Sequence, residues 1–210
     1  MERINRCINK LAFNFDTLWF LDVLYNINIE VMDKDKCPSP TACVMFKDFK
    51  INMLFNREFI DALSDDELLG VVLHETLHLA LYHNARNQGK HMQLWNIACD
   101  LEVNSIIKSL GFKLPEGGLL PEKDFELPNR LSSEMYYDKI YKEVEQMQQQ
   151  QGKGKGQGGG SGLGKYDRDT LDDHSQWSKS ESESELMKQI ADQVVKSAIE
   201  KNINDFLQTL

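Results

Sequence analysis

Apolar residues recur along most of the chain at the spacing of an α-helix. Between residues 2 and 31 they fall three or four positions apart in two series, which predicts two helices or one bent helix. After a breaker cluster at residues 37–40, two β-prone runs at 41–46 and 50–55 predict a β-hairpin. One of its strands would either hold an extended peptide by backbone hydrogen bonds or play a purely structural part.

Helical spacing dominates the rest of the chain. After a short helix or turn at 56–63, longer helices are expected at residues 64–83, 94–110, 134–150 and 184–210. Ser64, followed three residues later by Glu67, has the spacing of a capping box and marks the start of the first long helix. Gly111 ends the second, and the Pro- and Gly-containing stretch 114–130 predicts an irregular loop.

These elements predict an α+β fold that is mostly helical, with a small β-hairpin or sheet. We expect residues 1–147 to form the core of one domain and residues 166–210 to pack on the same domain as a C-terminal segment and helix. Residues 148–165 are rich in Gly, Gln and Lys and hold almost no apolar side chains. We therefore expect a disordered loop there, without any chemical role.

Composition narrows the range of partners. With 210 residues, 41% of them hydrophobic, the chain can bury a sizeable core. A net charge of -9 argues against a nucleic-acid-binding surface, because neutralising phosphates needs clustered Lys and Arg. The N-terminus shows neither a signal peptide nor an apolar run that could span a membrane, and four cysteines without C-x-x-C spacing fit reduced thiols. We expect a cytoplasmic protein that binds neither nucleic acid nor membrane.

The chemistry of the chain centres on His74, Glu75 and His78, an H-E-x-x-H motif. At about 100° per residue, the four steps between the histidines leave their imidazoles about 40° apart on one helix face, so one metal ion can touch both. Glu75 projects beside them, near enough to take a proton from a water without binding the metal. The flanking residues are uncharged, and a metal ion would compensate for burying three polar groups among them. This pattern predicts a Zn²⁺ site of hydrolytic type with Glu75 as the general base.

A third protein ligand is needed, because catalytic zinc sites usually have three and leave one position open for water. On the helix predicted at 94–110, Asn96, Asp100 and Asn104 recur every four residues and form a polar stripe on an otherwise apolar helix. A helix that returns after a turn packs antiparallel beside the metal helix, so we favour Asp100 as the third ligand, supported by Asn96 or Asn104. The alternative is His83, which on an unbroken helix would lie about 180° from His74. With Asp100 as the ligand, His83 would lie either behind the metal ligands, without touching the metal, or on the surface.

Five short motifs follow one another along the chain: residues 40–42, residues 74–78 with His83, residues 95–100 with Asn104, residues 114–118, and residues 172–174 with Trp177. Together they resemble a family of metallopeptidase domains found in bacteria and phages. The resemblance implies a zincin-like metallopeptidase that acts on a peptide or protein substrate, in the host cytoplasm if a phage encodes it. Cellular members often continue into a von Willebrand factor A-like domain. This chain ends soon after residues 172–174, so we expect that a separate protein partner supplies that domain or that it is missing.

His174 has two interpretations that the sequence leaves open. As a catalytic residue it would donate to the oxyanion of a tetrahedral intermediate; as a structural one it would be held by Asp172 or Asp173. Tyr136, Tyr137 and Tyr166 are weaker oxyanion candidates.

Three classes of function remain compatible with the sequence. The favoured one is a zinc metallopeptidase. The others are a catalytically silent binding or assembly module on the same fold, and a zinc hydrolase of a non-peptide amide or ester.

Overall fold

The computed structural model describes residues 1–13, 17–47, 50–151, 163–168, 170, 189–190, 192–193 and 196. The chain divides into two compact units. Unit 1 comprises Met1–Arg86, Ile107–Glu116 and Asp172–Leu210, and unit 2 comprises Asn87–Ile106 and Gly117–Leu171. The fold is α+β and mostly helical, with one small sheet in the described residues, as the sequence predicts.

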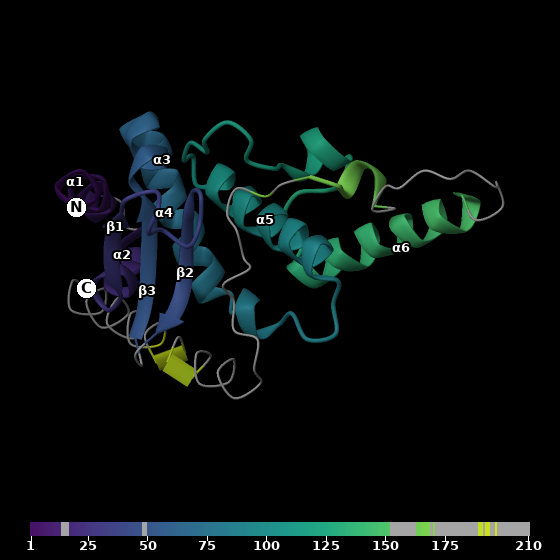
Figure 1. Ribbon diagram of the computed structural model, residues 1–210, viewed down its shortest axis with the longest axis horizontal. Coiled ribbons are helices and arrows are strands. Elements are labelled where there is room, and N and C mark those ends of the chain that lie inside the picture. Colours follow the sequence, from purple (N-terminus) through teal and green to yellow (C-terminus); the bar gives the residue numbers. More distant parts are fainter. Residues whose placement is uncertain are drawn as a thin grey trace, which may run out of the picture. The chain divides into compact units, whose positions relative to one another are not determined.

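Unit 1 is built on a three-stranded sheet with the strand order β1-β3-β2 (Figure 1). Strands β2 (Ala42–Lys47) and β3 (Lys50–Asn56) pair antiparallel, so the predicted hairpin is confirmed. Strand β1 (Asn28–Met32) pairs parallel to β3, with Glu30 opposite Leu54. The helical prediction for residues 28–31 was therefore wrong. A five-residue strand on a sheet edge gains its hydrogen bonds from a partner 24 residues away, and local spacing does not reveal that partner.

Three short helical elements precede the sheet strands in the sequence, and one follows them. They are α1 (Glu2–Asn9), the 3₁₀ turn η1 (Lys10–Phe13), α2 (Leu18–Tyr25) and α3 (Arg57–Ala62). The Asn56 side chain caps α3 by accepting hydrogen bonds from the amides of Glu58 and Phe59. Helices α1 and α2 both contact the long helix α4 (Asp65–Ala80), which also contacts β2.

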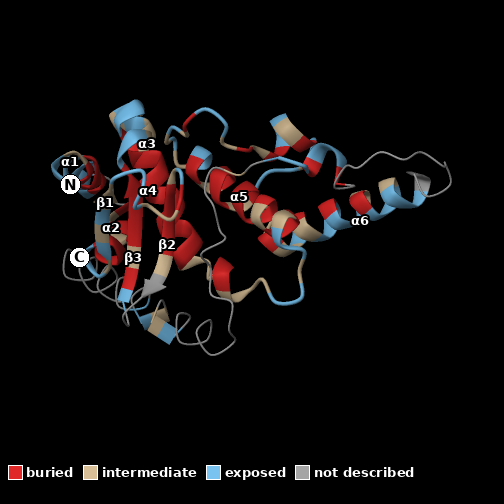
Figure 2. Cartoon of the chain, viewed as in Figure 1, coloured by how far each residue is buried: buried red, intermediate tan, exposed pale blue. Residues whose placement is uncertain are grey.

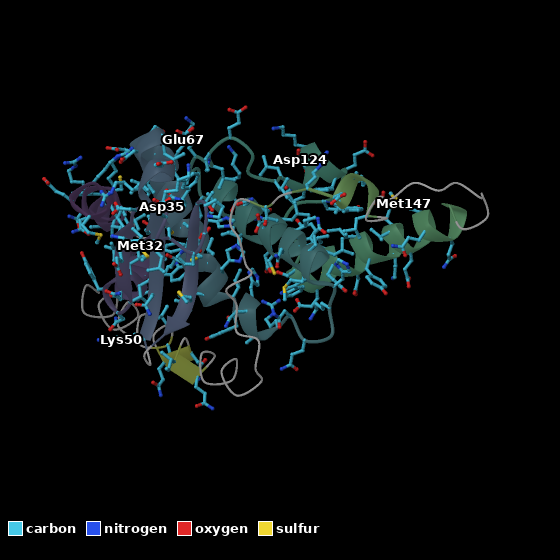
Figure 3. All side chains as sticks on the ribbon, in the orientation of Figure 1. Met32, Asp35, Lys50, Glu67, Asp124 and Met147 are labelled. Atoms are coloured by element: carbon cyan, nitrogen blue, oxygen red, sulfur yellow. The ribbon has the colours of Figure 1, made fainter. Side chains whose placement is uncertain are left out.

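Helix α4 starts at the capping box that the sequence predicts. The Ser64 hydroxyl accepts a hydrogen bond from the Glu67 amide, and the Glu67 carboxylate accepts one from the Ser64 amide at 2.9 Å. Figure 3 shows Glu67 at this N-terminal end of α4. From Leu68 to Leu79 every residue of the helix is buried, as the red ribbon in Figure 2 shows. A helix buried all round places its polar residues inside the protein.

The end of α5 (Met92–Ser109) leads into a segment that returns to the first half of α4. A Cβ atom added to Gly70 would lie 1.9 Å from the Lys113 carbonyl oxygen, so only a glycine fits there. The Lys113 ammonium also pairs with the Glu67 carboxylate at 2.9 Å. The backbone after α5 is thus held against α4 one turn before His74.

Unit 2 has its own apolar core, formed mainly by α5 and α6 (Ser133–Gln151). Its buried members are Leu94, Ile97, Ala98, Leu101, Leu119, Phe125, Tyr136, Ile140, Val144, Leu163 and Tyr166. The predicted loop between α5 and α6 contains one π-helical turn, η4 (Pro121–Phe125). Ser132 begins α6 by accepting a hydrogen bond from the Met135 amide, as one of the two candidate caps.

The stretch 148–165 is ordered at both ends. Helix α6 continues to Gln151, and Leu163 is buried just before the 3₁₀ turn η5 (Gly164–Tyr166). Residues 152–162 lie outside the described residues, as does most of the helix predicted at 184–210. Among the described residues, no helix is both long and apolar enough to cross a membrane.

Candidate metal centre

His74 and His78 face each other on α4. Both side chains are buried, at 0% and 3% exposure, and their Nε2 atoms lie 2.9 Å apart. The rings meet edge to face, with centroids 4.5 Å apart. This arrangement follows from the four-residue spacing on a regular helix, because the two side chains stand one turn apart on the same face. Two ring nitrogens therefore point at one place.

The distance between these nitrogens suits a shared metal ion. In a tetrahedral zinc site with Zn–N bonds of about 2.0–2.1 Å, two ligand nitrogens lie about 3.3 Å apart. A separation of 2.9 Å is a few tenths of an ångström shorter, and a small side-chain rotation would make up the difference. The pair thus has the donor type, and nearly the spacing, that a shared metal ion requires.

Asp100 completes a possible ligand set. It lies on α5, is fully buried, and offers a carboxylate oxygen in a group with His74 and His78 whose ligand atoms all lie within 4.8 Å of one another. On the same polar stripe, Asn104 donates from Nδ2 to the Leu119 carbonyl at 2.9 Å. The Oδ1 atom of Asn96 is buried and accepts no hydrogen bond from the described residues. Whether either amide supports Asp100 stays a prediction.

Glu75 follows His74 directly on α4. It is 1% exposed and lies in the middle of α4, about 100° around the helix from His74. The motif thus buries a carboxylate in the same turn of α4 as the first imidazole.

His83 does not point away from the site, as an unbroken helix would require. Helix α4 ends at Ala80, and Tyr82 adopts a left-handed conformation with φ 55° and ψ 34°. The chain turns back there, so His83 is fully buried and its Nδ1 lies 2.9 Å from the Nδ1 of His78. The geometric argument for its direction was therefore wrong, although an outer-shell position for His83 was one of the two predicted places. This turn could not be predicted from the sequence, because tyrosine seldom adopts positive φ.

The other predicted site residues have different environments. His174 and its neighbours Asp172, Asp173 and Trp177 lie outside the described residues. The tyrosine hydroxyls take part in hydrogen bonds of unit 2: Tyr136 donates to the Pro128 carbonyl, Tyr166 donates to Glu143, and Tyr137 accepts from the His91 amide. Burial, followed by the hydrogen bond to Glu143, raises the pKa of Tyr166 above its usual value.

Sequence reasoning also missed Gly70, which lets the Lys113 carbonyl approach α4. A signal was available, because a glycine inside a helix costs about 1 kcal/mol relative to alanine and so suggests a packing reason.

Residues 25–205 match a family model described as "Putative metallopeptidase domain". The chain belongs to this family. This match confirms the resemblance inferred from the ordered motifs. It leaves out only residues 1–24 and 206–210. Neither a curated protein nor a solved structure matches the chain significantly. For this metallopeptidase-domain protein, the His-His-Asp group is a candidate holder of a metal ion.

Proposed function

We propose that this chain is a zinc-dependent peptidase in which His74, His78 and Asp100 hold one zinc ion. The observation that carries the proposal is the convergence of two imidazole nitrogens and a carboxylate, all buried, within 4.8 Å. Two nitrogen ligands and one oxygen ligand form a set that occurs in catalytic zinc sites, where the fourth position stays open. Family membership supports peptide hydrolysis over other reactions.

When bound, zinc would supply a water of lowered pKa and polarise a carbonyl oxygen. Glu75 is the proposed general base. Its carboxylate accepts a proton from the attacking water and then delivers it to the amide nitrogen that leaves. Because α4 is buried and regular, Glu75 and the two histidines are held in fixed relative positions before a substrate arrives.

Metal content tests the ligand set. Purified protein should bind about one zinc, and His74→Ala or His78→Ala should lose it. His91→Ala is the matched control, because His91 is exposed and lies outside this group. Stoichiometric zinc in the His74→Ala/His78→Ala double variant would contradict the assignment.

Asp100 needs a separate comparison. Asp100→Asn keeps the side-chain volume but supplies a neutral oxygen, so zinc affinity should fall by orders of magnitude. Asp138→Asn, on the exposed face of α6, controls for the loss of one negative charge. Equal affinity of the two variants would remove Asp100 from the ligand set.

Turnover tests the reaction class. Glu75→Gln should keep the zinc but abolish cleavage, which mass spectrometry of a proteome-derived peptide library can measure. Activity that depends on Glu75 only with small acyl esters or amides would favour a non-peptide hydrolase instead. No Glu75-dependent activity on any substrate would favour a binding or assembly module. His174→Gln, assayed on the same library, tests its proposed donation to the oxyanion.

A further inference from the structure

A chain of three imidazoles runs through unit 1. His74 and His78 meet through their Nε2 atoms at 2.9 Å, and His78 and His83 meet through their Nδ1 atoms at the same distance. The second pair also meets edge to face, with centroids 4.9 Å apart and an interplanar angle of 71°. All three rings are at most 3% exposed. His78 therefore uses one ring nitrogen towards the proposed metal position and the other towards His83.

The direction of the hydrogen bond follows from the chemistry of imidazole. A neutral ring carries its proton on one nitrogen and a lone pair on the other. If His78 binds metal through Nε2, its Nδ1 must carry the proton and donate it. The Nδ1 of His83 is then the acceptor, and His83 carries its own proton on Nε2.

We propose that His83 is a positioning residue, which fixes the tautomer and the ring orientation of His78 so that its Nε2 lone pair faces the metal. This inference rests on the proposed zinc site. In metal-binding histidines, the N–H of the second ring nitrogen almost always donates a hydrogen bond to a carboxylate, a carbonyl or a water. Here an imidazole takes that place. The proposed role depends on the Nδ1 atom of His83 as a hydrogen-bond acceptor, not on the volume of its ring.

The turn that brings His83 to this position is built into the end of α4. Tyr82 adopts its left-handed conformation between Leu81 and His83, and its carbonyl accepts a hydrogen bond from the Ala85 amide at 3.0 Å. Its phenol donates to Asp192 at 3.0 Å, a residue 110 positions later in the chain. The guanidinium of Arg86 donates to the Leu81 carbonyl. The backbone around His83 is thus held on both sides.

Two substitutions separate hydrogen bonding from packing. In His83→Asn, the amide oxygen stands as many bonds from Cα as the Nδ1 of histidine and keeps the acceptor. His83→Phe keeps the ring and its volume but has no acceptor. If His83 acts through its nitrogen, Asn should hold zinc better than Phe. If it only fills space, Phe should be the better replacement.

The measurement is zinc affinity, determined by competition with a chromophoric chelator, alongside the visible absorption spectrum of the cobalt-substituted protein. We expect His83→Phe to weaken zinc binding about 10- to 100-fold and to change the cobalt spectrum, and His83→Asn to stay close to wild type. The melting temperature of each metal-free variant shows whether it is folded.

Wild type and His74→Ala must be titrated in the same series. If the wild type binds zinc no better than His74→Ala, the proposed metal site itself is refuted. If the wild type binds tightly while His83→Phe matches or exceeds His83→Asn, the site stands and the positioning role of His83 is overturned.

Discussion

Gly70 offers a test in which two effects of opposite sign compete. It lies inside α4, where alanine is intrinsically preferred over glycine by about 1 kcal/mol. Helix propensity alone therefore predicts that Gly70→Ala stabilises the protein. The structure predicts the reverse, because the new Cβ would lie 1.9 Å from the Lys113 carbonyl oxygen and 3.0 Å from its carbon.

The size of the effect follows from this contact. Moving the carbonyl oxygen out to even 3.0 Å requires a shift of at least about 1.1 Å, and the neighbour is backbone, which cannot rotate away as a flexible side chain does. Overpacking of a tight core costs about 1–3 kcal/mol, and we place this case at the upper end. After subtracting the gain in propensity, we expect a loss of about 2 kcal/mol. For a chain of this length that lowers the melting temperature by about 4–8 °C.

Urea unfolding followed by circular dichroism measures the loss, on protein treated with a chelator. Lys113→Ala is the matched control, because it deletes the exposed ion pair with Glu67 but leaves the Lys113 carbonyl in place. Such pairs contribute about 0–1 kcal/mol, so the control should change stability little. A Gly70→Ala variant more stable than wild type would show that the backbone after α5 does not lie against α4.

Three further predictions concern the ends of α4. Ser64→Ala should cost about 1 kcal/mol in urea unfolding, since it removes one half of the capping box; an unchanged midpoint would contradict the cap. Hydrogen bonds from Ser64, then the Lys113 ammonium, lower the pKa of Glu67 to about 2 from a usual value of 4.5. The resulting stability is present above pH 4.5 and is lost as the pH falls towards 2, so the stability difference between wild type and Glu67→Gln should shrink over that range. Burial, then the hydrogen bond to Asp192, raises the pKa of Tyr82 to about 12 from 10.0, so its stabilisation is present below pH 10 and is lost as the pH rises towards 12. Tyr82→Phe should remove that part of the alkaline unfolding curve, and a curve identical to wild type would contradict the contact.

The amino-acid sequence determined the local features of this protein. The capping box at Ser64, the hairpin formed by β2 and β3, and the facing imidazoles of His74 and His78 all depend on residues a few positions apart. Helix and strand periodicity is a local property, so the spacing of residues was sufficient to predict them. The family was recognisable for the same reason, because its motifs are short and occur in a fixed order.

Tertiary structure alone decided the features that depend on distant partners. Strand β1 forms because β3 offers it hydrogen bonds, and Leu163 is buried because the core of unit 2 surrounds it. His83 contacts His78 because Tyr82 takes a conformation that its sequence does not favour. Left-handed backbone in a non-glycine residue persists only where surrounding contacts hold it, here including the bond from Tyr82 to Asp192. Neighbours along the chain do not encode such contacts. The hydrogen bond between the Nδ1 atoms of His78 and His83 therefore could not be predicted from the sequence.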